Sequence, residues 1–378
     1  MSGLPSQPFF NAPVQRVALA RERFFDRGER PTGLVSEAVI QSWTRCLGAR
    51  NDPQRVVAFD PVTRSRLHAT LERNRALLQA ATDDITRLEA ALAGTGARVL
   101  LTDPQGVIIH ATQGTGSGDE QLLPLVSRPG VNIDEVAVGT NAPAMVAKTG
   151  QAVTVTAAEH FYDCMHRLRC AAAPIRDGQG RVAGVLDLTV EARPFAFDAA
   201  ALVGVYATLI ENRLLLASSS EHLVLRFQVC SSMIGSPLEA LAGIASDGRL
   251  AWQNGTAQQL LGLQPRETPD AESVLGTPVS QLLAQTREDA PMPLRLPNGL
   301  TVWLRARQPG PAVTAPAPIQ AEVPAAATAM ESTLGESTQQ LIANTLAECG
   351  GNISRAARRL GVSRGLLYRR LRSAGLSE

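Results

Sequence analysis

The segment NISRAARRLGVSRGLLYRRLRSAGLSE, residues 352–378, governs how the C-terminal part of this 378-residue chain folds. Asn352 stands where it can cap a short helix, and Gly361 supplies a sharp turn after that helix. Ser363 can then cap a second helix. The apolar face of the first helix consists of Ile353, Ala356, Ala357 and Leu360. Two short helices joined by a glycine-containing turn predict a helix-turn-helix unit.

Positive charge is concentrated in the same segment. Its one acidic residue is Glu378, and the whole chain has a formal net charge of only +1. The basic residues are Arg355, Arg358, Arg359, Arg364, Arg369, Arg370 and Arg372. Such a local excess is typical of a surface that binds a phosphate backbone. The alternative is a solvated helix face that keeps the C-terminus soluble, but the coincidence of charge with helix-turn-helix spacing disfavours it.

These residues resemble the C-terminal domain of the nucleoid protein Fis, which also ends the sigma-54-dependent activators. The resemblance runs from Glu336 onward and implies an all-α dimeric unit. In it a preceding helix, here 336–349, pairs with its twin, and the second helix of the turn motif enters the major groove of double-stranded DNA. The matching residues are Asn352, Arg355, Ala356, Ala357, Gly361, Ser363, Arg364, Gly365 and the run Arg369-Arg370-Leu371-Arg372.

The resemblance implies a set of DNA-contacting residues. Ser363 and Arg364 stand at the start of the second helix, within reach of base edges and phosphates. Leu366 is apolar where the family often has a small polar residue, so no contact is assigned to it. The complete set is Asn352, Arg355, Ser363, Arg364, Gly365, Tyr368, Arg369, Arg370 and Arg372.

Composition favours buried cores and no membrane span. Hydrophobic residues make up 44% of the chain. The longest uncharged apolar stretch, residues 199–210, is shorter than the roughly 20 residues that a membrane helix needs. The N-terminal sequence lacks a signal-peptide pattern. Five scattered cysteines suit reduced thiols. We therefore expect a cytoplasmic, nucleoid-associated protein.

The middle of the chain predicts an antiparallel sheet flanked by helices. Strands are expected at 98–102, 107–110, 152–156, 169–175 and 182–190. A helix is expected at 141–149, capped by Thr140, and a long helix at 199–216 that can continue through 221–229. Residues 36–47 form a further short amphipathic helix.

A heptad pattern precedes this sheet. Its core positions are Leu67, Leu71, Asn74, Leu78, Ala81, Ile85, Leu88 and Leu92. One Asn among apolar core residues is typical of a dimeric coiled coil, in which it fixes the register. A single amphipathic helix lying on its own domain's sheet explains the pattern equally well.

Three further blocks resemble the GAF sensor domain of the acetoin-catabolism regulator family. They are GTNAPAMVAKTGQAV (139–153), AEHFYDCMHRLRCAAAPIRD (158–177) and GRVAGVLDLTVE (180–191). The resemblance implies a pocket between sheet and helices, which in such domains binds a small molecule, haem or nothing. The effector is unknown, and no cofactor is assigned.

His160, Cys164, His166 and Cys170 alternate at short intervals, as soft metal ligands can. They lack a paired C-x2-C, and Cys170 is expected in a buried strand. We therefore interpret them as pocket lining and core, with no metal. The candidate pocket residues are His160, Phe161, Cys164, Met165, His166 and Cys170.

Residues 229–307 resemble a reduced PAS domain, with Asn298-Gly299 as a hairpin turn. An Ala/Pro-rich tether follows. The expected fold class is therefore α+β multidomain. Its parts are an N-terminal helical region (1–60), a GAF domain (61–217), a PAS-like domain (218–307), a linker (308–333) and an all-α Fis-type domain (334–378).

The ATPase module of full-length acetoin-type activators is absent from this sequence, which contains no G-x4-G-K-[ST] phosphate loop. We therefore interpret the chain as a ligand-responsive DNA-binding regulator that forms a homodimer and is not an enzyme. RNA polymerase and a full-length activator are further candidate partners. Two alternatives stay open. One is an accessory subunit of a sigma-54-dependent activator, and the other is a GAF-based redox or ligand-sensing enzyme.

Overall fold

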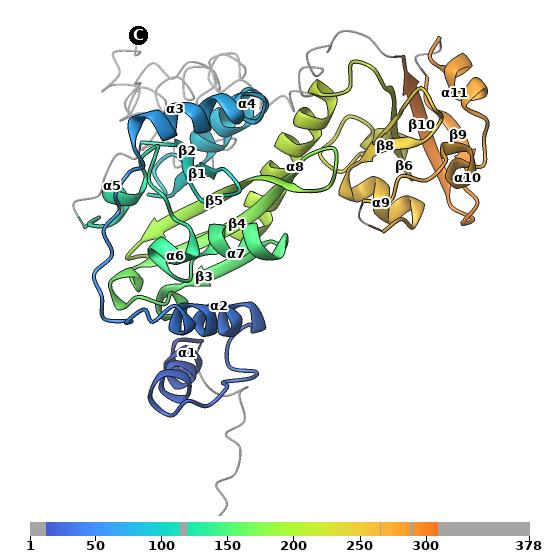
Figure 1. The fold of residues 1–378 in the computed structure, drawn as a ribbon. Helices are drawn as coiled ribbons and strands as arrows, with labels where there is room; N and C mark the ends of the chain where they lie inside the picture. The colour runs from blue at the N-terminus through green and yellow to red at the C-terminus, as the bar shows by residue number, and fades with distance from the viewer. Residues whose placement is uncertain (1–12, 114–118, 265, 288–289, 309–378) are drawn as a thin grey trace, which may run out of the picture. The chain divides into compact units, whose positions relative to one another are not determined.

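The computed structural model describes residues 13–113, 119–264, 266–287 and 290–308. These residues form two five-stranded antiparallel sheets with helices packed on them (Figure 1). The expected α+β class is confirmed for this part of the chain. The linker beyond residue 308 and the helix-turn-helix segment lie outside the described residues.

The first sheet has the strand order β2-β1-β5-β4-β3. Its strands are β1 (Arg98–Thr102), β2 (Ile108–Ala111), β3 (Val153–Thr156), β4 (Leu168–Arg176) and β5 (Val182–Glu191). All five expected strands are confirmed within two residues at each end. The strand β5 is central, with Leu188 opposite Val99 of β1 and Ala171 of β4.

Helices cover both faces of this sheet. On one face, α4 (Arg75–Ala91) and α8 (Ala199–Ala217) pack against Leu101, Leu186 and Leu188. The other face packs around Leu100, Ile108 and Val185. The elements on that side are α2 (Glu37–Gly48), α5 (Leu123–Val126), α6 (Glu135–Val138), α7 (Ala142–Thr149) and the short turns η3 (Ala157–Glu159) and η4 (Asp163–Met165). Alternate residues of each strand therefore serve two separate cores.

The N-terminal helices share the second of these cores. The elements α1 (Pro13–Arg21) and η2 (Glu22–Asp26) precede α2, which Ser36 caps by accepting a hydrogen bond from Val39 N. Trp43 of α2 is fully buried, and its indole N–H donates to Glu159 O at 2.8 Å. Residues 13–59 are thus packed onto the first sheet and do not form a core of their own.

The heptad segment is interrupted. It forms α3 (Arg64–Arg73) and α4, which are separated at Asn74, whose side chain donates to Thr70 O at 2.8 Å. Leu77, Ala81, Ile85 and Leu88 of α4 are buried against the sheet. The continuous coiled-coil helix is therefore wrong, and the amphipathic helix on its own domain's sheet is what the structure shows.

The second sheet has the order β8-β7-β6-β10-β9. The strands are β6 (Leu223–Gln228), β7 (Ala240–Ile244), β8 (Leu250–Gln253), β9 (Met292–Arg295) and β10 (Thr301–Arg307). The helices are η5 (Ser231–Met233), α9 (Gly255–Leu261), α10 (Ala271–Leu275) and α11 (Val279–Gln285). Continuation of the long helix through 221–229 is wrong, because alternate residues Leu223, Leu225 and Phe227 enter the core of this sheet as strand residues.

Helix α8 is longer than the apolar stretch suggested by the sequence. Among the described residues it is the one helix whose length and composition would suit a membrane span. Its buried residues include Ala207, Ile210 and Leu214, which pack against the first sheet. The polar Glu211 and Asn212 are also buried. This burial is that of a core helix in a globular protein.

Gly184 of β5 provides a test of this packing. A Cβ atom there would lie 2.5 Å from Leu77 Cδ2 and 2.8 Å from Thr102 O. We expect Gly184→Ala to destabilise the protein by about 1–3 kcal/mol through overpacking. The matched control is Gly204→Ala in α8, where a Cβ meets nothing within 4 Å. That change should be neutral or stabilise by up to about 1 kcal/mol. Urea denaturation measures both, and equal effects of the two substitutions would contradict the packing of α4 on β5.

Candidate functional site

The predicted DNA-contacting residues, Asn352 to Arg372, lie outside the described residues. The site that the structure describes is a small cavity on the side of the first sheet that faces α5, α6 and α7. Its volume is about 20 Å³, which is room for about one water molecule. Its lining residues are Leu100, Val126, Ile133, Val138, Asn141, Pro143, Met165, Leu168, Cys170, Asp187 and Thr189.

Two of the six predicted pocket residues, Met165 and Cys170, line this cavity. Phe161 is fully buried and stacks edge-on against Tyr162 and Phe25. Cys164 Sγ donates to Arg55 O at 3.8 Å, and His166 Nε2 lies 3.6 Å from Asp163 Oδ1. Among the described residues, no group of three or more His, Cys, Asp or Glu side chains is placed to hold a metal ion.

His160 lies behind the cavity wall and is fully buried. Burial lowers the pKa of its imidazole to about 4, so the ring is neutral at physiological pH. Its Nδ1 lies 2.9 Å from Ala157 O and must donate there, because a carbonyl oxygen only accepts. Nε2 is then the acceptor, and Cys170 Sγ, at 3.6 Å, donates to it. Burial also raises the pKa of the Cys170 thiol, which stays protonated.

Asp187 is the residue that the sequence reasoning missed. It is 1% exposed and faces the cavity from the centre of β5. Thr189 Oγ1 donates to its Oδ2 at 2.5 Å and lies 3.3 Å from Cys170 Sγ. Oδ1 has no hydrogen-bond partner in the described part of the chain. Burial raises the pKa of this carboxyl to about 7, although the Thr189 bond acts in the opposite direction.

Asn141 orients the cavity wall and is committed to it. Its Nδ2 donates to Ile133 O and Gly139 O at 2.9 and 2.8 Å, and its Oδ1 caps α7 by accepting from Ala144 N. The cap of this helix is therefore Asn141, not Thr140 as expected. Thr140 instead places its hydroxyl 2.7 Å from Ser42 Oγ of α2.

Glu135 anchors α6, which carries the lining residue Val138, to α2. Its carboxylate receives bonds from Arg45 Nε and Nη2 at 2.6 and 2.7 Å and from Ser42 Oγ at 2.5 Å. Burial alone would raise the pKa of Glu135, but the Arg45 and Ser42 hydrogen bonds outweigh it and lower the pKa. The N-terminal helices therefore hold one wall of the cavity in place.

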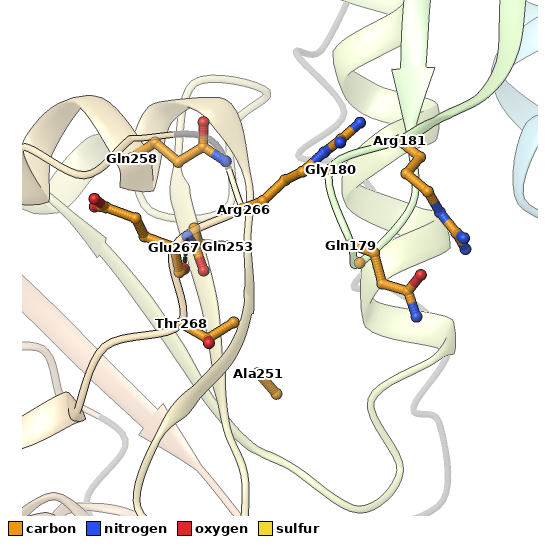
Figure 2. Close-up of a pocket in the computed structure, with 10 residues that line it drawn as sticks. Gln179, Gly180, Arg181, Ala251, Gln253, Gln258, Arg266, Glu267 and Thr268 are labelled. Atoms are coloured by element: carbon orange, nitrogen blue, oxygen red, sulfur yellow. Dashed lines mark hydrogen bonds between the residues drawn. The ribbon is translucent and has the colours of Figure 1, made fainter.

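A second, open pocket lies at the β4–β5 turn. Figure 2 shows its lining, with Gln179, Gly180 and Arg181 from the turn and Gln253, Arg266 and Glu267 among the residues opposite. Gln253 Nε2 donates to Glu267 O at 2.8 Å. None of these polar groups is both buried and without a partner, so this pocket gives no sign of a specific ligand.

Two models of known protein families match parts of this chain. The model of the MimR N-terminal domain matches residues 13–211, just over half of the chain. The model of the bacterial regulatory protein, Fis family, matches residues 333–373.

The similar proteins are regulators. The acetoin catabolism regulatory protein of Cupriavidus necator is 32% identical over 68% of this chain and 39% of its own length. The propane 2-monooxygenase operon transcriptional activator MimR of Mycolicibacterium smegmatis is 28% identical over 52% of this chain and 32% of its own. The Escherichia coli regulatory protein of the PTS-dependent dihydroxyacetone kinase operon is 27% identical over 66% and 38%. The chain thus spans about two fifths or less of the length of these curated relatives.

Among solved structures, the Escherichia coli DhaR(N)–DhaL complex contains a chain that superimposes with a TM-score of 0.44 at 18% identity. The match covers 72% of this chain and all of that one.

Asp187 predicts a pH dependence of stability. The pKa of an Asp carboxyl is ordinarily 3.8, and that of Asp187 in the folded protein is about 7. Between these values the unfolded state releases the proton while the folded state keeps it, so stability falls as pH rises and the loss is complete above pH 7. We expect Asp187→Asn to flatten this dependence and to be the more stable form at pH 8. Each unit of pKa difference corresponds to about 1.4 kcal/mol.

Urea denaturation at several pH values between 4 and 8 measures this. The exposed carboxylate Asp83 on α4, which pairs with Arg213, offers the control Asp83→Asn, which should leave in place the part of the pH dependence attributed to Asp187. Parallel profiles for Asp187→Asn and the unmodified protein would show that Asp187 is not the titrating group.

Proposed function

The chain belongs to the family that the MimR N-terminal domain defines, and on this premise we propose that it is a ligand-responsive, DNA-binding transcription regulator that acts without an ATPase of its own. The observation that carries the proposal is the combination of a Fis-family segment with a small cavity lined by Asp187, whose Oδ1 has no hydrogen-bond partner among the described residues. In this proposal the cavity belongs to a sensor module and the Fis-family segment is the output module of the same chain.

The output module is the C-terminal segment. The Fis-family match at residues 333–373 coincides with the arginine-rich helix-turn-helix pattern of the sequence. Arg364 is proposed to contact base edges and Arg369 the phosphate backbone. A Fis-type unit buries its first helix against a second copy, so we propose a homodimer that binds two half-sites about one DNA turn apart.

The sensor is proposed to be GAF-like in its first sheet and PAS-like in its second, with the effector bound in the cavity at Asp187. Relatives are named for acetoin catabolism, a propane 2-monooxygenase operon and a dihydroxyacetone kinase operon, which supports a small effector. Binding would bias the DNA-binding state by a coupling free energy of typically about 1–3 kcal/mol. The proposed setting is the cytoplasm, with the protein on the nucleoid.

The absence of a phosphate loop from this sequence supports a mechanism without ATP. A segment rich in Ala and Pro connects the second sheet to the Fis-family segment. The protein would then repress, or activate by recruiting RNA polymerase. No catalytic role is proposed.

A second candidate function is an accessory subunit of a full-length sigma-54-dependent activator. The chain is 32% identical to the Cupriavidus regulator over 263 residues while covering 39% of that protein's length. Mixed dimers through the Fis-type unit would then modulate that activator. A protein that binds DNA only when the activator is present would favour this candidate over the first.

Arg364 tests the DNA-binding assignment. We expect Arg364→Ala to remove sequence-specific binding, because loss of a bidentate base contact costs about 1–3 kcal/mol in discrimination. Arg358→Ala, on the first helix of the motif, should weaken binding to all DNA similarly or have little effect. Electrophoretic mobility shifts with operator and scrambled DNA measure both. Unchanged affinity and preference in Arg364→Ala would remove this residue from the specificity set.

The mechanism without ATP makes a separate prediction. Purified protein should hydrolyse no ATP and should not activate a sigma-54 promoter by itself, since the sequence offers no phosphate cradle. A coupled phosphate-release assay on the chain measures this, with a sigma-54 activator that has an intact phosphate loop as positive control. Hydrolysis that copurifies with the chain through several columns would refute the prediction.

A further inference from the structure

The polar atoms of the cavity are all committed except one. Both the amide nitrogen and the amide oxygen of Asn141 are hydrogen-bonded within the cavity wall. Cys170 donates to His160, and Thr189 donates to Asp187 Oδ2. The chain of hydrogen bonds therefore ends at Asp187 Oδ1, which has no partner among the described residues. A buried acceptor in this position costs free energy until a donor reaches it.

We propose that Asp187 is the specificity-determining residue of the effector site, and that the effector is a small uncharged molecule whose hydroxyl group donates to Asp187 Oδ1 while its apolar part fills the rest of the cavity. This inference rests on the proposed function and adds the chemical class of the ligand.

The walls of the cavity fix the apolar part of the ligand. Apart from Asn141, Asp187 and Thr189, the lining side chains are hydrophobic or a thiol, from Leu100 on β1 to Leu168 and Cys170 on β4. An anion would stand against the Asp187 carboxylate in a low-dielectric site. A cation would have to lose its own hydration on entering, which a single carboxylate seldom repays. An uncharged ligand avoids both costs.

The size of the cavity limits the ligand to a few heavy atoms. A volume of about 20 Å³ must grow for anything larger than water. The side chain best suited to move is Met165, which is unbranched and is the last residue of the short turn η4. Val126 closes another side from the four-residue helix α5. These two elements are therefore the ones expected to shift when the ligand enters.

The substitution Asp187→Asn tests the proposal directly, because it replaces the hydrogen-bond acceptor that faces the cavity with a donor. In the variant, Thr189 can still donate to the amide oxygen, and the amide nitrogen then faces the cavity as a donor. A ligand with a hydroxyl donor should lose affinity, whereas a ligand with a carbonyl acceptor should gain it. The substitution thus predicts a reversal of preference and not merely a weaker site.

The experiment uses the full chain labelled at the methionine methyl groups, with the Met165 resonance assigned from a Met165→Leu sample. Four probes with four heavy atoms each are titrated at pH 8.5: isopropanol, acetone, isopropylamine and acetate. We expect isopropanol to shift the Met165 signal with a dissociation constant at least tenfold below that of acetone, and the two ions to cause no shift. In Asp187→Asn, acetone should bind at least as tightly as isopropanol. Asp83→Asn should behave as the unmodified protein.

Several results would overturn the inference. They are the absence of any Met165 shift with all four probes, tighter binding of isopropylamine or acetate than of isopropanol, and an unchanged preference in Asp187→Asn. If that variant does not fold, the order of the four probes on the unmodified protein still decides the question. No DNA is present, so these outcomes are independent of whether Arg364 and the Fis-type segment bind an operator.

Discussion

The first sheet depends on the burial of both faces of strand β5. Every residue from Gly184 to Glu191 is buried, so the strand cannot exist without a layer of helices on each side. Leu186 and Leu188 face α4 and α8, and Gly184 allows Leu77 of α4 to approach. Asp187 and Thr189, which alternate with these leucines, face the cavity. The two helix layers and the cavity are thus consequences of one strand.

Periodic patterns in the sequence were sufficient for most of the elements but not for their contacts. The five strands of the first sheet follow from alternation and turn residues, as Asp103 to Gly106 illustrates. The break at Asn74 was hidden, because Asn is also acceptable at a coiled-coil core position. Because residues 223–228 follow a long helix, the local sequence allows that helix to continue through them. Pairing with β7 and β10 instead makes these residues a strand. Such long-range pairing leaves little local signal.

Asp187 escaped notice for a similar reason. The residue types of His160, Cys164, His166 and Cys170 suggest metal chemistry, whereas a single Asp in an apolar strand belongs to no recognisable motif. The signal was nonetheless present in VAGVLDLTVE, where a carboxylate interrupts a strand with both faces buried. A buried carboxylate without full pairing destabilises the fold, and side chains of this kind concentrate at functional sites.

Helix α8 packs on the face of the first sheet opposite the cavity and connects this sheet with the second. Glu211 accepts from Arg176 N at the end of β4 at 2.9 Å, and the next residue, Asn212, accepts from Asn254 Nδ2 at 2.9 Å. Asn254 in turn caps α9, and its Oδ1 also accepts a hydrogen bond from Leu241 N of β7. Since Cys170 of β4 lines the cavity, a ligand that displaces this strand would strain the buried Glu211 contact on α8. The adjacent Asn212–Asn254 bond would then be one contact through which the second sheet responds.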